Sequence, residues 1–181
     1  MKKIKIAYIN IMEGYSGGEI VLQRLIRGIN RDKFSIYVYS TPTKFIDTLK
    51  CNECNTTIIN TQYQLKMERG IKAFVKVIKL FVMSGKYIYE MKQKQILIIH
   101  SNSLTSNIYF SFWAKIFGIK FIAHSHEIRE GIIFTLLHKY ICFCSDKIIC
   151  VSDAVKNNWL SHNVNKKKLT VVYNGVSNDF F

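Results

Sequence analysis

Short apolar segments alternate with longer amphipathic ones along the whole chain, and this alternation constrains the fold more than any other feature. Runs such as Ile-Leu-Ile-Ile at 96–99 and Lys-Ile-Ile-Cys-Val at 147–151 are almost continuously apolar. Strands that are covered on both faces of a parallel sheet have this composition. The pattern predicts seven strands, over residues 3–9, 34–40, 56–60, 96–100, 120–124, 147–151 and 169–173.

Helical periodicity fills the intervals between the predicted strands. We predict helices over residues 19–31, 44–50, 66–94 with a break at Gly85, 104–117, 131–144 and 154–161. Strands that alternate with crossover helices form an α/β domain. The sequence therefore predicts a Rossmann-like, doubly wound sheet of about seven mainly parallel strands with helices on both faces. A length of 181 residues suffices for one such domain.

The charge of the chain indicates anionic partners such as phosphates or lipid surfaces. The net charge is +14, and five cysteines, an odd number, occur without an export signal, which favours a cytoplasmic setting. Nucleic acid is not an expected partner, because zinc-finger, KH and RRM signatures are lacking and the basic residues are scattered. Cys51 and Cys54 have the spacing of zinc ligands, but no second pair follows, so ordinary thiols are expected.

The segment 66–94 leaves two interpretations open. Lys72, Lys76 and Lys79 share one face of this predicted helix, and most of its other residues are apolar. It is either a core helix with a solvated lysine face, which we favour, or an amphipathic helix that lies on an anionic membrane surface. The second interpretation predicts a peripheral protein at the inner face of a membrane.

A glycine-rich loop joins the first predicted strand to the first predicted helix. It reads Gly14-Tyr-Ser-Gly-Gly-Glu19, so Gly17 and Gly18 lie at the strand-to-helix turn. The free N–H groups of a helix start bind phosphate or diphosphate where no Cβ blocks the approach. The loop therefore predicts an anionic, nucleotide-linked ligand, although a glycine pair here also serves as plain turn chemistry.

Polar clusters follow five of the predicted strands at the point where each strand ends. Because ligands of doubly wound sheets bind outside the carboxyl ends of the strands, these clusters are predicted to form one surface. The clusters are Asn10 with the glycine-rich loop, His100-Ser-Asn-Ser103, His124-Ser-His-Glu127, Ser152-Asp153 and Asn174-Gly175.

Individual members of these clusters have competing interpretations. His126 is predicted to hydrogen-bond a substrate hydroxyl, with a purely structural role as the alternative. His100 and Asn102 either cap a helix or contact ligand, and Ser152 is expected to cap the helix that follows it. A metal bound by His124, His126 and a third ligand is not expected, since we predict that the two imidazoles leave the strand on opposite faces.

These motifs, in this order and spacing, resemble the N-terminal domain of a family 4 glycosyltransferase, which has a two-domain, metal-independent GT-B architecture. The resemblance covers essentially the whole chain. It rests on Gly14-Tyr-Ser-Gly-Gly-Glu19, Ile98-Ile-His-Ser-Asn-Ser103, Ile122-Ala-His-Ser-His-Glu127, Ile149-Cys-Val-Ser-Asp-Ala154 and Val171-Val-Tyr-Asn-Gly-Val176. One departure is Ser16, which stands where the family loop often has its first glycine.

The resemblance implies a retaining transfer of a sugar from a nucleoside diphosphate sugar to an acceptor hydroxyl, with no metal or other cofactor. Gly17 and Gly18 would lie beside the donor diphosphate. As catalytic residues, His126 would hydrogen-bond the transferred sugar and Glu127 would help to shape the site. The acceptor would be a glycan or lipid-linked, as in bacterial surface polysaccharide or glycolipid synthesis. Acceptor or sugar contacts are expected from Ser16, Glu19, His100, Asn102 and Ser103.

The resemblance also implies a domain boundary. Residues 1–174 would form the N-terminal, acceptor-side domain, and 175–181 would begin a linker, with Asn174 and Gly175 as a hinge. A C-terminal, donor-binding domain would be missing, so these 181 residues alone are predicted to be inactive. The alternative is a non-catalytic module that tethers a glycan or protein partner to an anionic surface. A nicotinamide-dependent dehydrogenase is disfavoured, because the glycine pattern is not G-x-G-x-x-G.

Overall fold

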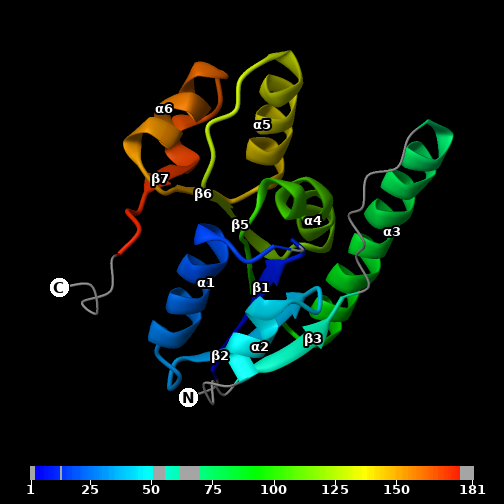
Figure 1. The fold of residues 1–181 in the computed structure, drawn as a ribbon, viewed down its shortest axis with the longest axis vertical. Coiled ribbons are helices and arrows are strands. Elements are labelled where there is room, and N and C mark those ends of the chain that lie inside the picture. Colours follow the sequence, from blue (N-terminus) through cyan, green and yellow to red (C-terminus); the bar gives the residue numbers. More distant parts are fainter. Residues whose placement is uncertain (1–2, 13, 51–55, 62–69, 176–181) are drawn as a thin grey trace.

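The computed structural model describes residues 3–12, 14–50, 56–61 and 70–175, in which strands and helices alternate (Figure 1). The strands are β1 (Ile4–Asn10), β2 (Phe34–Ser40), β3 (Thr57–Asn60), β4 (Ile98–Ser101), β5 (Lys120–Ser125), β6 (Lys147–Cys150) and β7 (Leu169–Val171). The helices are α1 (Gly17–Gly28), α2 (Lys44–Lys50), α3 (Ile71–Gln93), α4 (Leu104–Phe117), α5 (Ile132–Cys144) and α6 (Asp153–Ser161), and the 3-10 turn η1 (Lys166–Lys168) precedes β7.

All of these strands run parallel in one sheet, in the order β3-β2-β1-β4-β5-β6-β7, which confirms the predicted fold. The chain moves outward from β1 to β3, returns through α3, and then moves in the other direction from β4 to β7. The two halves meet between β1 and β4. This is the topological switch point, where ligands of doubly wound sheets bind.

Apolar cores on the two faces of the sheet hold the layers together. The larger core lies under α3, α4, α5 and α6 and includes Phe110, and the smaller lies under α1 and α2 and includes Leu22. Successive residues of a strand point to opposite faces, so Ile9 of β1 enters the larger core and Tyr8 the smaller. The continuously apolar strands seen in the sequence are thus explained by burial on both sides.

The predicted break of the long helix at Gly85 is wrong. α3 runs without interruption from Ile71 to Gln93. Gly85 serves close packing instead, because a Cβ at this position would lie 3.0 Å from Cε2 of Trp113 on α4. The indole N–H of Trp113 also donates a hydrogen bond to the carbonyl oxygen of Phe81 at 2.8 Å. The predicted start of this helix at Lys66 lies outside the described residues, as do Cys51 and Cys54.

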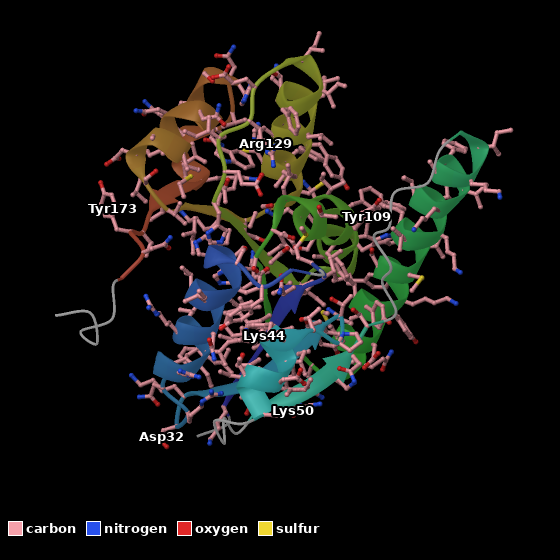
Figure 2. The ribbon with its side chains drawn as sticks, viewed as in Figure 1. Asp32, Lys44, Lys50, Tyr109, Arg129 and Tyr173 are labelled. Carbon is pink, nitrogen blue, oxygen red and sulfur yellow. The ribbon has the colours of Figure 1, made fainter. Side chains whose placement is uncertain are left out.

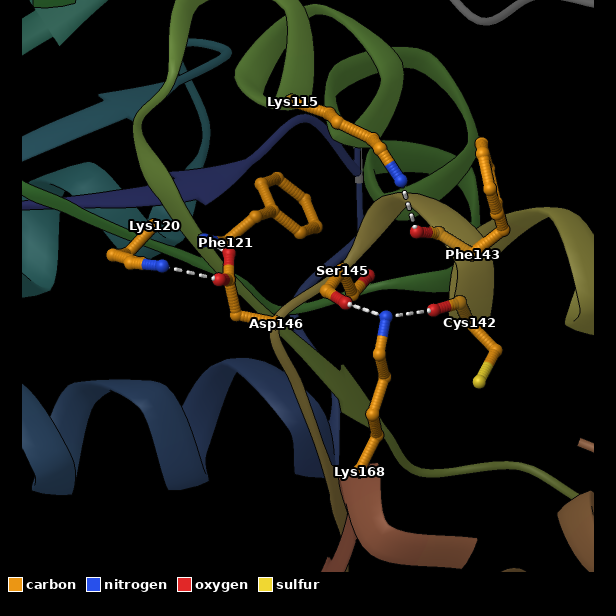
Figure 3. Close-up of polar contacts among 8 residues, drawn as sticks. All are labelled: Lys115, Lys120, Phe121, Cys142, Phe143, Ser145, Asp146 and Lys168. Carbon is orange, nitrogen blue, oxygen red and sulfur yellow. Dashed lines mark hydrogen bonds and ion pairs between the residues drawn. The ribbon is translucent and has the colours of Figure 1, made fainter. Parts of the chain in front are cut away.

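Lysine side chains bind backbone carbonyl groups at the edge of the sheet where the strands begin. Lys168 donates hydrogen bonds to the carbonyl oxygens of Cys142 and Ser145 at 2.7 Å each, at the end of α5 (Figure 3). Lys115 donates in the same way to the carbonyl oxygen of Phe143 at 2.8 Å. The last carbonyl groups of a helix lack intrahelical partners and carry partial negative charge, so these cations stabilise the end of α5.

Asp146 ties β5 to the turn that precedes β6. Its carboxylate accepts a hydrogen bond from the backbone N–H of Phe121 at 2.9 Å and forms an ion pair with Lys120 at 2.8 Å (Figure 3). The charged side chains Lys115, Lys120, Asp146 and Lys168 are therefore all paired at this edge.

Candidate functional site

The glycine-rich loop leads into a firmly capped helix start. Ser16 is the N-cap of α1, so the helix begins at Gly17, before the predicted start at Glu19. The buried carboxylate of Glu19 accepts hydrogen bonds from the backbone N–H of Ser16 at 2.8 Å and from its hydroxyl at 2.7 Å. Such a capping box sets the direction in which the helix starts. The box occupies the N–H of Glu19, whereas the N–H groups of Gly17 and Gly18 have no intrahelical partner and remain available to a ligand.

Asn102 joins the start of α1 to His126. Its Nδ2 donates a hydrogen bond to the carbonyl oxygen of Gly18 at 3.0 Å, and its Oδ1 lies 3.2 Å from Nε2 of His126. These residues follow β1, β4 and β5, which are neighbours in the sheet. The glycine turn and the second imidazole of the His-Ser-His sequence therefore lie on the same rim, as the sequence predicts.

The two glycines of the turn have different surroundings. A Cβ at Gly18 would meet Nδ2 of Asn102 at 3.7 Å and the ring of His126 at 3.9 Å, whereas a Cβ at Gly17 would meet nothing within 4 Å. Gly18 thus faces His126 across the site. A larger side chain at this position would occupy the space between the helix start and the imidazole.

The hydrogen bonds of Asn102 determine which nitrogen of His126 carries the proton. Because Nδ2 of Asn102 donates to the carbonyl oxygen of Gly18, the amide oxygen is the atom that faces His126. An amide oxygen only accepts, so Nε2 of His126 is the donor and Nδ1 of the neutral ring is an acceptor. Burial lowers the pKa of His126, against the opposing effect of the carboxylates of Glu19 and Glu127. The ring is therefore neutral at pH 7.

A pocket of about 340 Å³ lies at the switch point, between the loops that follow β1, β4 and β5. Its lining is rich in hydrogen-bonding groups and includes the start of α1. The structure brings together seven of the predicted site residues in this one pocket, namely Ser16, Gly18, Glu19, Asn102, Ser103, His126 and Glu127.

Two further histidines lie next to His126. Nε2 of His100 lies 3.1 Å from Nδ1 of His124, and the ring centroids of His124 and His126 are 4.2 Å apart. The prediction that His124 and His126 diverge is therefore wrong, because residues two apart along a strand direction point to the same face. Burial lowers the pKa of His100 to about 4 and that of His124 to about 2, and the neighbouring imidazoles add to both shifts.

Metal-ligand geometry is not found in the described ranges, where no group of three or more His, Cys, Asp or Glu side chains is arranged to hold an ion. The three histidines instead contact one another as neutral rings. Burial lowers the pKa of each ring, and the neighbouring imidazoles lower the pKa of His100 and His124 further.

Side chains of α6 hold the backbone of the segment between β5 and α5. Asn158 accepts a hydrogen bond from the N–H of Arg129 and donates one to its carbonyl oxygen, both at 3.1 Å. Nε2 of His162 donates to the same carbonyl oxygen at 3.0 Å. Arg129 is labelled in Figure 2, and its guanidinium pairs with the exposed carboxylate of Glu127, with Nε donating at 2.6 Å. This network positions the segment that carries His126 and Glu127.

Ser103 and His100 have structural contacts of their own. The Ser103 hydroxyl caps α4 and accepts a hydrogen bond from the N–H of Ser106 at 3.2 Å. Ser152 caps α6 in the same way, as predicted, and accepts from the N–H of Val155 at 3.2 Å. His100 is 6% exposed and lines a second pocket rather than the polar one.

The second pocket lies on the face of the sheet that α1 covers, beside the described end of the chain. It measures about 630 Å³ and has mainly apolar walls, to which Ile98 and Ile122 contribute. The predicted hinge residues Asn174 and Gly175 line it, and the carbonyl oxygen of Gly175 accepts a hydrogen bond from Arg24 of α1 at 2.8 Å.

Sequence reasoning missed His138, which reaches the polar pocket from α5. The side chain is 1% exposed, and its Nδ1 has no hydrogen-bond partner in the described structure. Burial and the neighbouring His162 lower the pKa of His138 to about 4. One signal in the sequence could have identified it, since it is the only imidazole of a mainly apolar helix.

Comparisons with known proteins add sequence relationships to this geometry. The profile of the family described as Glycosyltransferase Family 4 matches residues 15–180. An uncharacterized glycosyltransferase of Methanocaldococcus jannaschii, MJ1178, is 28% identical over 183 residues, an alignment that covers 97% of this chain and 48% of the relative.

Solved structures share the fold at low sequence identity. Anabaena Alr3699/HepE, solved in complex with UDP-glucose, superposes with a TM-score of 0.71 and 15% identity over 96% of this chain and 44% of that one. A glycosyltransferase from Rickettsia africae has a TM-score of 0.69 and 16% identity over 99% of this chain and 45% of that one. The chain thus spans about half the length of the proteins that it matches.

Proposed function

The chain belongs to glycosyltransferase family 4, and on that premise we propose that it is the acceptor-side half of a sugar-transferring enzyme. The reaction moves a sugar from a nucleoside diphosphate sugar to an acceptor hydroxyl, with retention of configuration at the anomeric carbon. The observation that carries the proposal is the junction of Gly18, Asn102 and His126 at the switch point. In it, an open helix start and a neutral imidazole belong to one hydrogen-bonded unit beside a polar pocket.

The donor diphosphate lies against the first turn of α1. The free N–H groups there and the positive end of the helix dipole favour a doubly charged ligand. Gly17 and Gly18 permit close approach, since neither carries a Cβ. UDP-glucose in the Anabaena structure, which has the same fold, supports a nucleotide sugar as the ligand. We propose that neither a metal nor another cofactor takes part.

His126 orients the transferred sugar through the nitrogen that Asn102 leaves free. Nε2–H is engaged with Asn102, so Nδ1 accepts a hydrogen bond from a sugar hydroxyl near the reacting carbon. Glu127, held by Arg129 at the exposed rim, shapes the side on which the acceptor arrives. Ser16, Glu19 and Ser103 complete the wall of the pocket that the acceptor or the sugar contacts.

A C-terminal domain supplies the remaining donor contacts in this proposal. The chain covers 44–48% of the lengths of MJ1178 and the Anabaena protein, which supports a two-domain protein. Residues 1–174 are then the acceptor-side domain, and Asn174 and Gly175 lie at the hinge between the domains. The acceptor is a glycan or a lipid-linked sugar.

The test is a transfer assay on the complete encoded protein with a panel of sugar nucleotides and lipid-linked acceptors. His126→Ala is expected to lower turnover about a hundredfold, as loss of one preorganised hydrogen-bonding group does in other active sites, while the melting temperature stays within a few degrees of the parent. Absence of transfer with every donor would indicate a non-catalytic binding module. Full turnover by the His126→Ala variant would assign the imidazole a structural role only.

A further inference from the structure

The first half of α3 carries an apolar face that no described residue covers. Ile71, Phe74, Val75, Ile78 and Val82 recur at spacings of three and four, so they lie on one face of the helix. These side chains are 84, 67, 57, 48 and 50% exposed, in that order. The second half of the helix differs, because it packs into the core beside α4.

The position of this face makes it accessible. In Figure 1 the first turns of α3 extend away from α4 and from the sheet. Soluble monomers rarely leave several large apolar side chains together in water, and such patches mark interaction sites. In the described part of the chain, no helix has the length and apolar character that crossing a bilayer requires. The face is therefore suited to lie on a surface.

A row of lysines flanks the apolar face. Lys72, Lys79 and Lys86 recur every seven residues, which places them along one side of the helix, and all three are exposed. The described part of the helix contains one acidic residue, Glu90, which pairs with Lys94 at the far end. Helices α4 and α5, which follow α3 in the layer, contain no Asp or Glu. Among the described residues of these three helices, the apolar and lysine side chains are thus accompanied by a single acid, Glu90, which is paired with Lys94.

We propose that this face of α3 binds the surface of an anionic phospholipid bilayer. The five apolar side chains enter the boundary between headgroups and acyl chains, to a depth of about 5–10 Å, and the lysine row stays with the phosphates. A second copy of this chain fits the face less well, because it would bring two lysine rows together. Charge complementarity therefore selects a negatively charged bilayer.

The geometry of the sheet links this surface to the candidate site. Helices that follow parallel strands begin at the edge where the strands end, so α3 and α5 both begin at the edge that carries the polar pocket. α5 also begins with exposed apolar side chains, Ile132 at 79% and Ile133 at 68%. An acceptor carried on a lipid would thus lie near the pocket, which is the one respect in which the inference rests on the proposed function.

The experiment measures co-sedimentation of the purified chain with vesicles of phosphatidylcholine alone or mixed with phosphatidylglycerol. We expect binding to the anionic vesicles only, weakened by salt. The double variant Phe74→Glu/Ile78→Glu should lower the partition coefficient about tenfold or more, because two large apolar side chains no longer leave water. Leu97→Glu is the matched control, since Leu97 is 57% exposed at the opposite edge and should bind like the parent.

Two further variants test the arrangement of the face. Lys72→Gln/Lys79→Gln should reduce binding to anionic vesicles about fivefold per lysine and weaken the salt dependence. Phe74→Trp should show a blue-shifted emission that brominated lipids quench on anionic vesicles. Thermal melting confirms that each variant is folded, as expected for exposed positions.

Several outcomes would overturn the inference. Equal binding by Phe74→Glu/Ile78→Glu and the parent would do so, as would no binding to anionic vesicles. Dimerisation that this double variant abolishes, without any vesicle binding, would assign the face to a second copy of the chain. Sugar transfer to a soluble acceptor by the complete protein is independent of vesicle binding, so loss of one without the other separates this inference from the proposed function.

Discussion

The two edges of the sheet use polar side chains in opposite ways. Where the strands begin, Lys168 and Lys115 are bound to the final carbonyl groups of α5, and Asp146 is bound to its neighbours (Figure 3). Where the strands end, the first turn of α1 is open, and Nδ1 of His138 and Nε2 of His124 are buried without hydrogen-bond partners in the described residues. The charged side chains of the first edge are paired, although in the described structure the hydroxyl of Ser145 is buried without a partner there as well. At the second edge the unpartnered groups include titratable rings, which we propose serve a ligand.

This difference shows that the pairing of charged and titratable side chains, rather than their presence, separates the two edges. Both edges contain charged or titratable groups, so composition alone does not separate them. Unpaired buried polar groups cost folding free energy, and they are tolerated where they serve binding. Variants at the two edges should therefore change different observables.

The largest effect on the free energy of unfolding is expected from acidification, which acts on the histidines at the edge where the strands end. The folded-state pKa of His100 is about 4 and its ordinary value is 6.5. Between pH 6.5 and pH 4 the unfolded chain therefore binds a proton at His100 that the folded chain does not bind. The free energy of unfolding that the neutral ring contributes is complete above pH 6.5 and is lost as the pH falls toward 4. The difference corresponds to about 3 kcal/mol for this residue.

Urea unfolding at pH 7, 6, 5 and 4.5 measures this loss. His124, His126 and His138 also have lowered pKa values and should add to it in the same direction. An unfolding free energy that stays level from pH 7 to pH 5 would contradict the buried, neutral state of these rings.

The next effect is at the edge where the strands begin. Lys168→Met removes two charge-assisted hydrogen bonds from carbonyl groups at the end of α5, and we expect a loss of about 2 kcal/mol in unfolding free energy. Chemical denaturation measures it, and donor affinity should not change. Lys167→Met is the matched control, because Lys167 is exposed on the same turn. Equal stability of the two variants would show that Lys168 does not stabilise the fold through these hydrogen bonds.

A smaller effect is expected at the glycine turn, and it should appear in substrate binding rather than in stability. Gly18→Val places a side chain between the helix start and His126, and we expect the KM for the donor in the complete protein to rise about tenfold. Gly17→Val carries the same helix-propensity cost but leaves the space between Gly18 and His126 free, so its KM should rise less than that of the Gly18 variant. Equal KM values for the two variants would show that ligand does not approach between Gly18 and His126.

The smallest effect is expected in the network that holds the segment after β5. Asn158→Ala removes both side-chain hydrogen bonds to Arg129, and amide exchange across 126–131 should become about fivefold faster, a change of about 1 kcal/mol. Asn157→Ala, at an exposed neighbouring position, should leave the exchange unchanged. Unaltered exchange in the Asn158 variant would mean that the hydrogen bond from His162 to the carbonyl oxygen of Arg129 is sufficient to hold this segment.

The fold could be predicted from the sequence because its strands are buried on both faces. Phe34–Ser40, Lys44–Lys50 and Leu104–Phe117 have the predicted bounds, since apolar runs and periodic stripes extend to their ends. Gly85 was misinterpreted as a break because its role depends on Trp113, a distant residue that only the packing of α3 on α4 brings close.

The site could be predicted in part. The rule that ligands bind where strands end identified Gly18, Asn102 and His126 together. The sequence does not distinguish Gly18 from Gly17, because that difference depends on how α1 is rotated about its axis. His138 was missed for a related reason, since it enters the pocket from the interior of a helix rather than from a loop.

The amide of Asn102 has a consequence for what this position can accommodate. One end of the side chain must give a hydrogen to the Gly18 carbonyl while the other takes one from His126. Aspartate has the same shape but offers two oxygens, and leucine has a similar volume but offers neither group. Of the side chains of this size, only asparagine offers a donor at one end and an acceptor at the other. The orientation of the imidazole therefore depends on the position of a backbone carbonyl group in a different helix, α1.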